Sequence, residues 1–275
     1  MKKLMGLILT LSVICMICGL CLNWGQGGPL YQPETYVTSE VADASEVNSH
    51  LDAANKRAGL LQDFHCVLSA KVYRRLTFNV EGEMAFSKPM QSNIVFNSRF
   101  GREVQIGSNE SEFWFYSKRM DQPGLYYARH EDLSRTRLKA PFHPLWLMQG
   151  LGLEPLTFSA TPRFEIDRDA VKVVAEERGP NGRGVRRVAL ITTADSTIRG
   201  SYLYDGEDAL IASVEINDRG GPPLFVPNKL RLVWVHEGEK VVMDVELKNQ
   251  KTNVGQRERF TRPVGYGRAI NMAAE

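Results

Sequence analysis

Three clusters of carboxylates are the residues whose type and spacing come closest to a catalytic arrangement. They are Glu110 with Glu112, Glu176 with Glu177, and Asp205 with Glu207 and Asp208. Paired carboxylates can act as acid and base in glycoside hydrolysis, or can bind calcium. Each cluster falls in a turn or at the end of an expected strand, where charged side chains usually face solvent. We therefore assign no catalytic residue and predict that the protein is not an enzyme; a hydrolase is the least favoured hypothesis.

The histidines and glycines also form no motif with a known chemistry. The five histidines, of which none lies four residues from another, are His50, His65, His130, His143 and His236. A metalloprotease helix needs two histidines at that spacing, so we predict no metal site and no cofactor. Residues 179–184 read Gly-Pro-Asn-Gly-Arg-Gly. No helix is expected after them to bind a phosphate, which indicates a hairpin.

The amino terminus has the order of an export signal. Lys2 and Lys3 precede an uncharged run over 4–22, and a cationic start before an apolar stretch is typical of a secretory signal. The run approaches the roughly 20 residues that span a bilayer, so cleavage and retention as an anchor both stay open. Lipidation at Cys21 is a third alternative, which Leu20 disfavours because a small residue usually precedes the lipidated cysteine. All three place the folded body outside the cytoplasm.

The cysteines and the charge balance exclude two further classes of protein. Cys15 and Cys18 lie with Cys21 in the apolar run, as small hydrophobic residues. Only Cys66 is left for the body, which therefore cannot form an internal disulfide. Lys and Arg total 34 against 32 Asp and Glu. A nucleic-acid-binding domain usually carries a clear basic excess, so we expect no nucleic-acid partner.

The rest of the chain predicts one helix followed by two series of strands. Residues 23–46 are polar and rich in Gly and Pro, as in a linker. Leu51, Ala54, Ala58 and Leu61 recur at helical spacing and predict an amphipathic helix over 47–66. A second, apolar helix is expected over 141–152. Strand patterns bounded by turn residues occur before it at 67–78, 81–86, 92–99, 103–107, 112–118 and 125–129, and after it at 163–166, 171–177, 185–192, 198–204, 209–217, 230–236 and 240–247.

This order predicts a mainly β protein with some α structure. The expected architecture is a single, highly curved antiparallel sheet, which is an incomplete, half-open β-barrel. The amino-terminal helix and the mid-sheet helix, acting as a lid, lie on its concave side. The predicted organisation is a signal peptide or anchor at 1–22, a linker at 23–46, the half-barrel domain at 47–268 and a tail at 269–275.

An unbroken aromatic run at 113–116, together with Trp146 and Leu147 in the second helix, has two interpretations. These residues could be ordinary packed core. Alternatively, the concave side of the sheet is incompletely filled and leaves an apolar cavity for an acyl chain beneath the helices.

The order of helix, strands, apolar helix and strands resembles the LolA/LolB-like family of lipoprotein carriers and acceptors. The similar segments, in order, are 64–65 with 71–72, Gly-Glu-Met-Ala-Phe-Ser-Lys-Pro at 82–89, 108–109 with the aromatic run, Pro-Leu-Trp-Leu-Met at 144–148, and Phe-Thr-Arg-Pro at 260–263. The resemblance implies an outer-membrane lipoprotein-sorting protein of the periplasm or envelope membrane. Carriers of this family have an arginine before the first proline that points into the cavity and bonds the lid. Lys88 stands there in this chain, and a lysine lacks the rigid fork of donors.

The resemblance and the alternation of strand residues together predict the ligand-binding residues. Residues two apart on a strand share a face, so each strand would direct its alternate side chains toward an acyl chain. The lid helix would cover these side chains. The predicted residues are Met84, Phe86, Lys88, Ile94, Phe96, Phe113 and Phe115 on strands, and Trp146, Leu147 and Leu151 on the lid. The expected partners are an acylated lipoprotein or lipid cargo and the envelope membrane, with the protein acting as a monomer. The alternative is a membrane-tethered structural or adaptor protein with the same fold and no lipid cargo.

Overall fold

The computed structural model describes residues 40–41, 44–73, 77–99, 101–118, 124–136, 144–179, 182–236, 239–255 and 260–273. The predicted signal or anchor at 1–22, with Cys15, Cys18 and Cys21, lies outside the described residues. So do most of the predicted linker and His143. Within the described part of the chain, no helix has the length and apolar character needed to cross a membrane.

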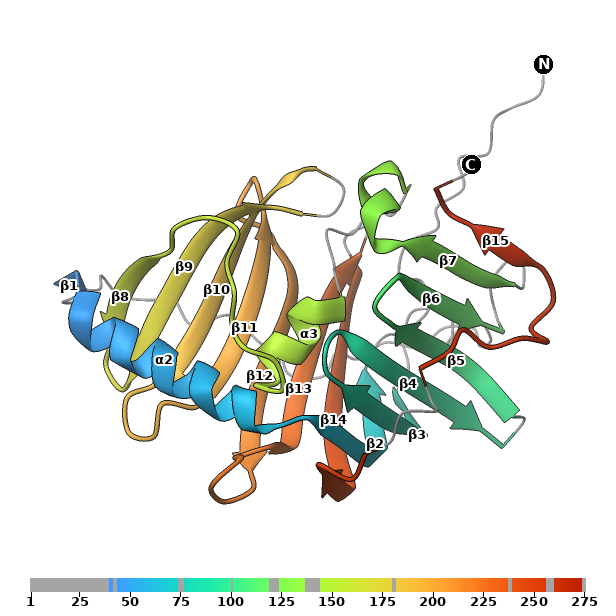
Figure 1. Cartoon of the computed structure of the whole chain (residues 1–275), viewed down its shortest axis with the longest axis horizontal. Helices are drawn as coiled ribbons and strands as arrows, with labels where there is room; N and C mark the ends of the chain where they lie inside the picture. The colour runs from blue at the N-terminus through green and yellow to red at the C-terminus, as the bar shows by residue number, and fades with distance from the viewer. Residues whose placement is uncertain are drawn as a thin grey trace.

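The described strands form one sheet (Figure 1). Their bounds are β1 (Glu40–Val41), β2 (Asp63–Tyr73), β3 (Thr77–Ser87), β4 (Gln91–Ser98), β5 (Gly101–Ser108), β6 (Glu112–Ser117), β7 (Leu125–Arg129), β8 (Arg163–Asp167), β9 (Ala170–Arg178), β10 (Gly184–Thr192), β11 (Ile198–Asp205), β12 (Leu210–Arg219), β13 (Pro227–His236), β14 (Glu239–Thr252) and β15 (Ala269–Asn271). The order across the sheet is β1-β8-β9-β10-β11-β12-β13-β14-β2-β3-β4-β5-β6-β7-β15.

The sheet is antiparallel and open, as the sequence predicts. Neighbouring strands are antiparallel except β15, which runs parallel to β7. β1 and β15 are the two edges and do not pair with each other. The sheet is strongly curved, and helices α2 (Ala44–Leu60) and α3 (Pro144–Gly150) lie across one face of it (Figure 1). The predicted half-open barrel with an amino-terminal helix and a mid-sheet helix is therefore confirmed.

Helix α2 is held against the sheet by its apolar stripe. Val47 and Ala54 are buried and belong to one hydrophobic cluster with Val173 of β9 and with Ala189 and Ile191 of β10. A larger hydrophobic cluster, the main core, lies on the same side of the sheet and includes residues of α3. The concave face therefore carries two apolar regions, one under α2 and one under α3.

The predicted end of the first helix is wrong. The sequence predicts helix over 47–66, but α2 ends at Leu60 and Asp63 begins β2. Phe64 fits the helical spacing from Leu61, yet Phe64 and Cys66 are two residues apart and both are buried as alternate residues of a strand. Because β2 pairs with β14 on one side and with β3 on the other, two ladders of backbone hydrogen bonds replace those of a further helical turn.

Other boundaries also differ from the prediction. The expected strand over 67–78 is divided, because β2 ends at Tyr73 and β3 begins at Thr77. A short 3-10 helix, η2 (His130–Arg135), follows β7 and was not predicted. Helix α2 begins at Ala44, inside the predicted linker, and β15 lies inside the predicted tail.

A close contact between β5 and β6 offers a site at which a substitution can test how tightly the sheet is packed. Gly107 is directly opposite Trp114, whose side chain is fully buried, and a Cβ atom on Gly107 would overlap the indole ring. We expect Gly107→Ala to lower the free energy of unfolding by about 1–3 kcal/mol, the usual cost of overpacking, in urea unfolding followed by circular dichroism. Gly184→Ala in β10 is the control, because open space surrounds that position. Equal stability of the two variants would contradict this account.

Candidate functional site

The candidate site is an apolar pocket of about 100 Å³ beneath α3. Its roof is α3 with the residue that follows, and its walls come from β2 to β5 and from β12 to β14. No charged side chain lines it within the part of the chain that the structure describes. The lining residues are Leu68, Met84, Ser92, Ile94, Phe96, Ile106, Trp146, Leu147, Met148, Leu151, Ser213, Leu230, Leu232, Val233, Trp234, Val241, Met243, Val245 and Leu247.

Strands β13 and β14 supply one wall through matched pairs of apolar residues. Leu232 is directly opposite Met243, and Leu230 is opposite Val245. Because residues two apart share a face of a strand, the apolar residues at 230, 232 and 234 and those at 241, 243, 245 and 247 line up on the concave side. The wall follows from the alternation of these two strands and from their register.

Helix α3 forms the roof and is fixed at its carboxyl end. A Cβ atom on Gly150 would lie 3.1 Å from Ser201 Cβ, so the helix approaches β11 closely at this glycine. The Gln149 side chain donates to the Pro155 carbonyl at 2.8 Å and to the Thr157 hydroxyl at 2.9 Å. Its oxygen accepts a hydrogen bond from Arg187 Nη2 at 2.6 Å. The inward face of α3 is apolar, and its polar contacts are gathered around Gln149.

The structure brings together six of the predicted ligand-binding residues in this pocket. Met84, Ile94 and Phe96 lie in its wall, and Trp146, Leu147 and Leu151 lie in its roof. Their role in binding stays a prediction.

Three predicted aromatic residues are buried in the main core without lining the pocket. Phe86, Phe113 and Phe115 are all less than a tenth exposed. Phe115 stacks on Tyr126 with ring centroids 5.1 Å apart. At Phe113 and Phe115 the structure matches the packed-core interpretation of the aromatic run, and Phe86 is packed core as well.

Lys88 does not line the pocket, although the sequence predicts that its side chain points inward. β3 ends at Ser87, so the alternation that places Met84 on the concave face does not extend to Lys88. Its Nζ atom instead donates to the carbonyl of Ala58 near the end of α2, at 2.5 Å. Burial lowers the pKa of Lys88, while the nearby carboxylate of Glu154 acts in the opposite direction. Lys88 thus ties the turn after β3 to α2.

Sequence reasoning missed the pocket residues of β12, β13 and β14. The signal was present, since apolar residues alternate with charged ones at Met243, Asp244, Val245 and Glu246. It predicted the strands correctly. The alternation does not predict that β14 pairs with β2. It is this pairing that brings the wall opposite Met84.

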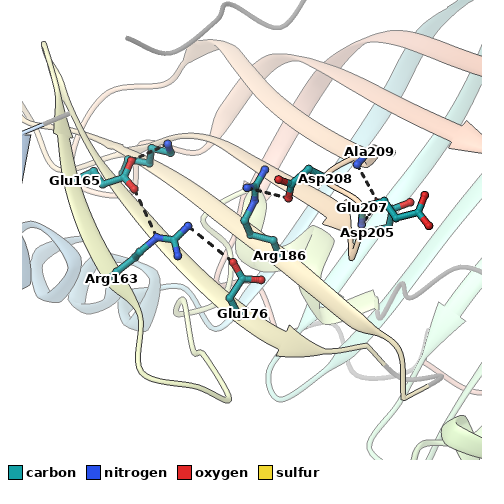
Figure 2. Close-up of polar contacts among 9 residues, drawn as sticks. Arg163, Glu165, Glu176, Arg186, Asp205, Glu207, Asp208 and Ala209 are labelled. Atoms are coloured by element: carbon teal, nitrogen blue, oxygen red, sulfur yellow. Dashed lines mark hydrogen bonds and ion pairs between the residues drawn. The ribbon is translucent and has the colours of Figure 1, made fainter. Parts of the chain in front are cut away.

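The acidic cluster at 205–208 has structural partners (Figure 2). Arg186 Nη1 lies 2.9 Å from Asp208 Oδ1. Asp205 Oδ1 accepts the backbone N–H groups of Glu207 and Ala209, both at 2.9 Å. One carboxylate therefore forms an ion pair and another closes the turn between β11 and β12.

The other two acidic clusters also contribute ion pairs. Glu176 Oε1 lies 3.8 Å from Arg163 Nη2, and both side chains are largely exposed (Figure 2). Glu112 Oε1 lies 3.4 Å from Arg262 Nε. An exposed pair such as that of Arg163 and Glu176 usually contributes less than about 1 kcal/mol. Glu176 faces solvent as expected, whereas the Glu112 side chain is only 18% exposed.

Cys66 and the histidines do not gather into a metal centre in the described residues. No group of three or more His, Cys, Asp or Glu residues is placed to hold a metal ion in the described ranges. Cys66 is buried, and burial raises the pKa of its thiol to about 12. A protonated, buried thiol is a poor nucleophile.

Solved structures share this architecture, among them the following two. A LolA superfamily protein from Nitrosomonas europaea superposes with a TM-score of 0.51 at 12% identity, over 78% of this chain and 97% of that one. A DUF1329 family protein from Desulfovibrio piger superposes with a TM-score of 0.50 at 12% identity, over 78% of this chain and 95% of that one. The fold is LolA-like. No protein-family model and no curated protein matches the sequence.

The LolA-like fold confirms the predicted resemblance at the level of architecture. At 12% identity the likeness extends to the fold alone. The function of this chain must therefore be argued from its own pocket and side chains.

The outer face of the pocket wall carries an ion pair with a testable pH dependence. Arg231 Nε and Nη2 donate to Asp244 Oδ1 and Oδ2 at 2.7 and 3.1 Å, across β13 and β14. These hydrogen bonds hold the pKa of Asp244 below its ordinary range. A carboxylate with a lowered folded-state pKa stabilises the protein above its unfolded pKa, about 3.9, and loses that contribution as the pH falls further.

We expect Asp244→Asn to lower the free energy of unfolding by about 0.5–1 kcal/mol at pH 7, the upper range for a partly exposed pair. The difference from the wild type should shrink as the pH falls below about 4. Urea unfolding at a series of pH values measures both. The control is Glu246→Gln, which removes an exposed carboxylate on the same face of β14 and should have a smaller effect. A difference that persists unchanged at low pH would refute the electrostatic explanation.

Proposed function

We propose that the protein is a carrier or acceptor of lipids or lipoproteins in the cell envelope and binds acyl chains in the pocket beneath α3. The observation that carries this proposal is the wall of the pocket, which is apolar except for Ser92 and Ser213 and lies under a helix on a LolA-like fold. Burying an acyl chain is favourable by about 0.8 kcal/mol per methylene group. Useful affinity therefore requires no catalytic group.

The volume of the pocket determines which position of α3 allows a long acyl chain to bind. About 100 Å³ is smaller than the roughly 150 Å³ apolar cavity that accommodates benzene. The structure with α3 in place has room for only a few carbon atoms. A full acyl chain therefore requires α3 to move away from the sheet, so we assign α3 the role of a lid.

The same volume also favours a second candidate. In an adaptor with a filled interior, the pocket would be a packing defect and the outer faces of the sheet would bind a protein. The two functions differ in whether the protein binds lipid at all. Export by residues 1–22, and either tethering or release by cleavage, are part of both proposals.

A variant that fills the pocket tests the proposed function. Ile94 is half-buried in the pocket wall, and in Ile94→Trp the larger ring should displace about two methylene groups of a ligand. At about 0.8 kcal/mol each, the expected loss of affinity for a fluorescent fatty acid is about tenfold, measured by titration. The matched control is Ile211→Trp, at a half-buried isoleucine of β12 outside the pocket wall.

Native mass spectrometry of the exported protein, with lipid extraction, complements the titration. We expect co-purifying lipid in the wild type and in Ile211→Trp, and less of it in Ile94→Trp. A well-folded wild type that is empty and indifferent to added fatty acid would reject the carrier function in favour of the adaptor. Equal affinity of the two variants would mean that lipid binds elsewhere.

A further inference from the structure

Arg187 of β10 is a buried cation whose hydrogen-bond partners are neutral. Its side chain is only 5% exposed. Nη1 donates to the Thr157 carbonyl at 2.9 Å and Nη2 to Gln149 Oε1 at 2.6 Å, while the Nε–H group has no hydrogen-bond partner. Among the described residues, no carboxylate forms an ion pair with this guanidinium.

This arrangement is costly in the absence of an anion. A buried charge without a paired opposite charge loses its hydration, which two hydrogen bonds to neutral acceptors and the Phe158 ring, whose centroid lies 5.0 Å from Arg187 Cζ, offset only in part. Burial lowers the pKa of Arg187 to about 10, and Glu177 acts in the opposite direction. Buried, strongly perturbed charges that face a cleft are candidates for functional sites, and arginine is suited to phosphate and carboxylate oxygens.

The position of Arg187 on its strand is an exception to an apolar pattern. Val185, Arg187, Ala189 and Ile191 are alternate residues of β10 and share its concave face. Val185 belongs to the main core, whereas Ala189 and Ile191 belong to the cluster under α2. Arg187 thus separates the two apolar regions of the concave face.

Arg187 lines a groove of about 460 Å³ that is separate from the apolar pocket. The groove lies between η2, α3, the segment after α3, and the ends of β9, β10 and β11. Both acids that line it have partners: Glu177 Oε1 accepts the Ser159 N–H at 2.6 Å, and Glu131 lies 3.2 Å from Arg129. Neither acid forms an ion pair with Arg187, although Glu177 attracts the guanidinium from a longer distance.

The groove and the apolar pocket lie on two sides of α3. Trp146 of α3 lines both of them, and α3 crosses the middle of the concave face (Figure 1). A ligand with an acyl chain under α3 and an anionic group beside Arg187 would occupy both spaces. Such a ligand is an amphiphile with an anionic headgroup.

We propose that the groove containing Arg187, Gln149 and Thr157 binds the phosphate of a phospholipid headgroup whose acyl chain occupies the apolar pocket. This inference rests on the proposed function and narrows its cargo to phosphate-bearing amphiphiles. The phosphate accepts hydrogen bonds from the guanidinium of Arg187. In this way it supplies a negative charge in direct hydrogen-bond contact with Arg187, which no described side chain provides.

The test compares two lipids that differ in the phosphate headgroup, dihexanoyl phosphatidylglycerol and dihexanoylglycerol, by titration of the full-length protein. Inorganic phosphate is the third probe. Hydrogen bonds to a charged group contribute about 1.5–3 kcal/mol, so the wild type should prefer the phospholipid by about 10- to 100-fold. Arg187→Gln should lose this preference and keep its affinity for dihexanoylglycerol. Arg187→Lys should keep part of the preference, because it keeps the charge.

The neighbouring arginine provides a matched control. Arg186 is on the same strand but the opposite face, where it pairs with Asp208, so Arg186→Gln should bind both lipids as the wild type does. If Arg187→Gln does not fold, the preference of the wild type and its partial retention in Arg187→Lys still decide the test.

Three results would overturn the headgroup site. They are equal affinity of the wild type for the two lipids, an unchanged preference in Arg187→Gln, and binding of inorganic phosphate that depends on Arg187 while neither lipid binds. The last would identify a site for free phosphate and would also reject the carrier function. By contrast, equal binding of both lipids would overturn the headgroup site and leave acyl-chain binding intact.

Discussion

The pairing of β14 with β2 is the interaction on which the rest of the structure depends. It joins the last long strand of the chain to the first and so unites β8 to β14 and β2 to β7 in one sheet. In this pairing Leu247 is opposite Leu68, and Val245 is opposite Ala70. The pocket takes one wall from each half, so neither half forms it alone. A pocket made this way exists only when two strands far apart in the sequence have paired.

The position of α3 follows from the same topology. After β7 the chain is at one side of the sheet, and β8, its next strand, pairs at the opposite side. The connection crosses the concave face, and α3 is the described part of it that covers the pocket. Gly150 allows the helix to approach Ser201 closely, and Gln149 fixes its end. The roof of the pocket is therefore a consequence of how the two halves are connected.

The sequence predicts those features that depend on local pattern. Alternation identifies most strands, including β13 and β14, and turn residues separate them. It fails at Phe64, where helical spacing and strand alternation coincide and only pairing with β14 and β3 decides. Lys88 was placed by alternation, but its strand ends one residue earlier. The opposite wall of the pocket depended on register between distant strands, which no local pattern contains. Arg187 carried a local signal, a lone cation at an inward position of an apolar strand, but its meaning depends on the groove around it.

Gln149 links the two spaces on either side of α3. It accepts a hydrogen bond from Arg187 Nη2 at 2.6 Å and belongs to the helix that roofs the apolar pocket. Nη2 carries two N–H groups, and a phosphate that accepts the one directed at Gln149 replaces the Gln149 oxygen as its acceptor. Occupation of the proposed headgroup site would then weaken the contact that holds α3 to β10, and α3 is the helix that must move for a long acyl chain to enter. Because binding effects between two sites are reciprocal, displacement of α3 would in turn make Arg187 a better ligand for the anion. The polar groove and the apolar pocket together would thus bind an amphiphile more tightly than they bind a free anion or a free acyl chain.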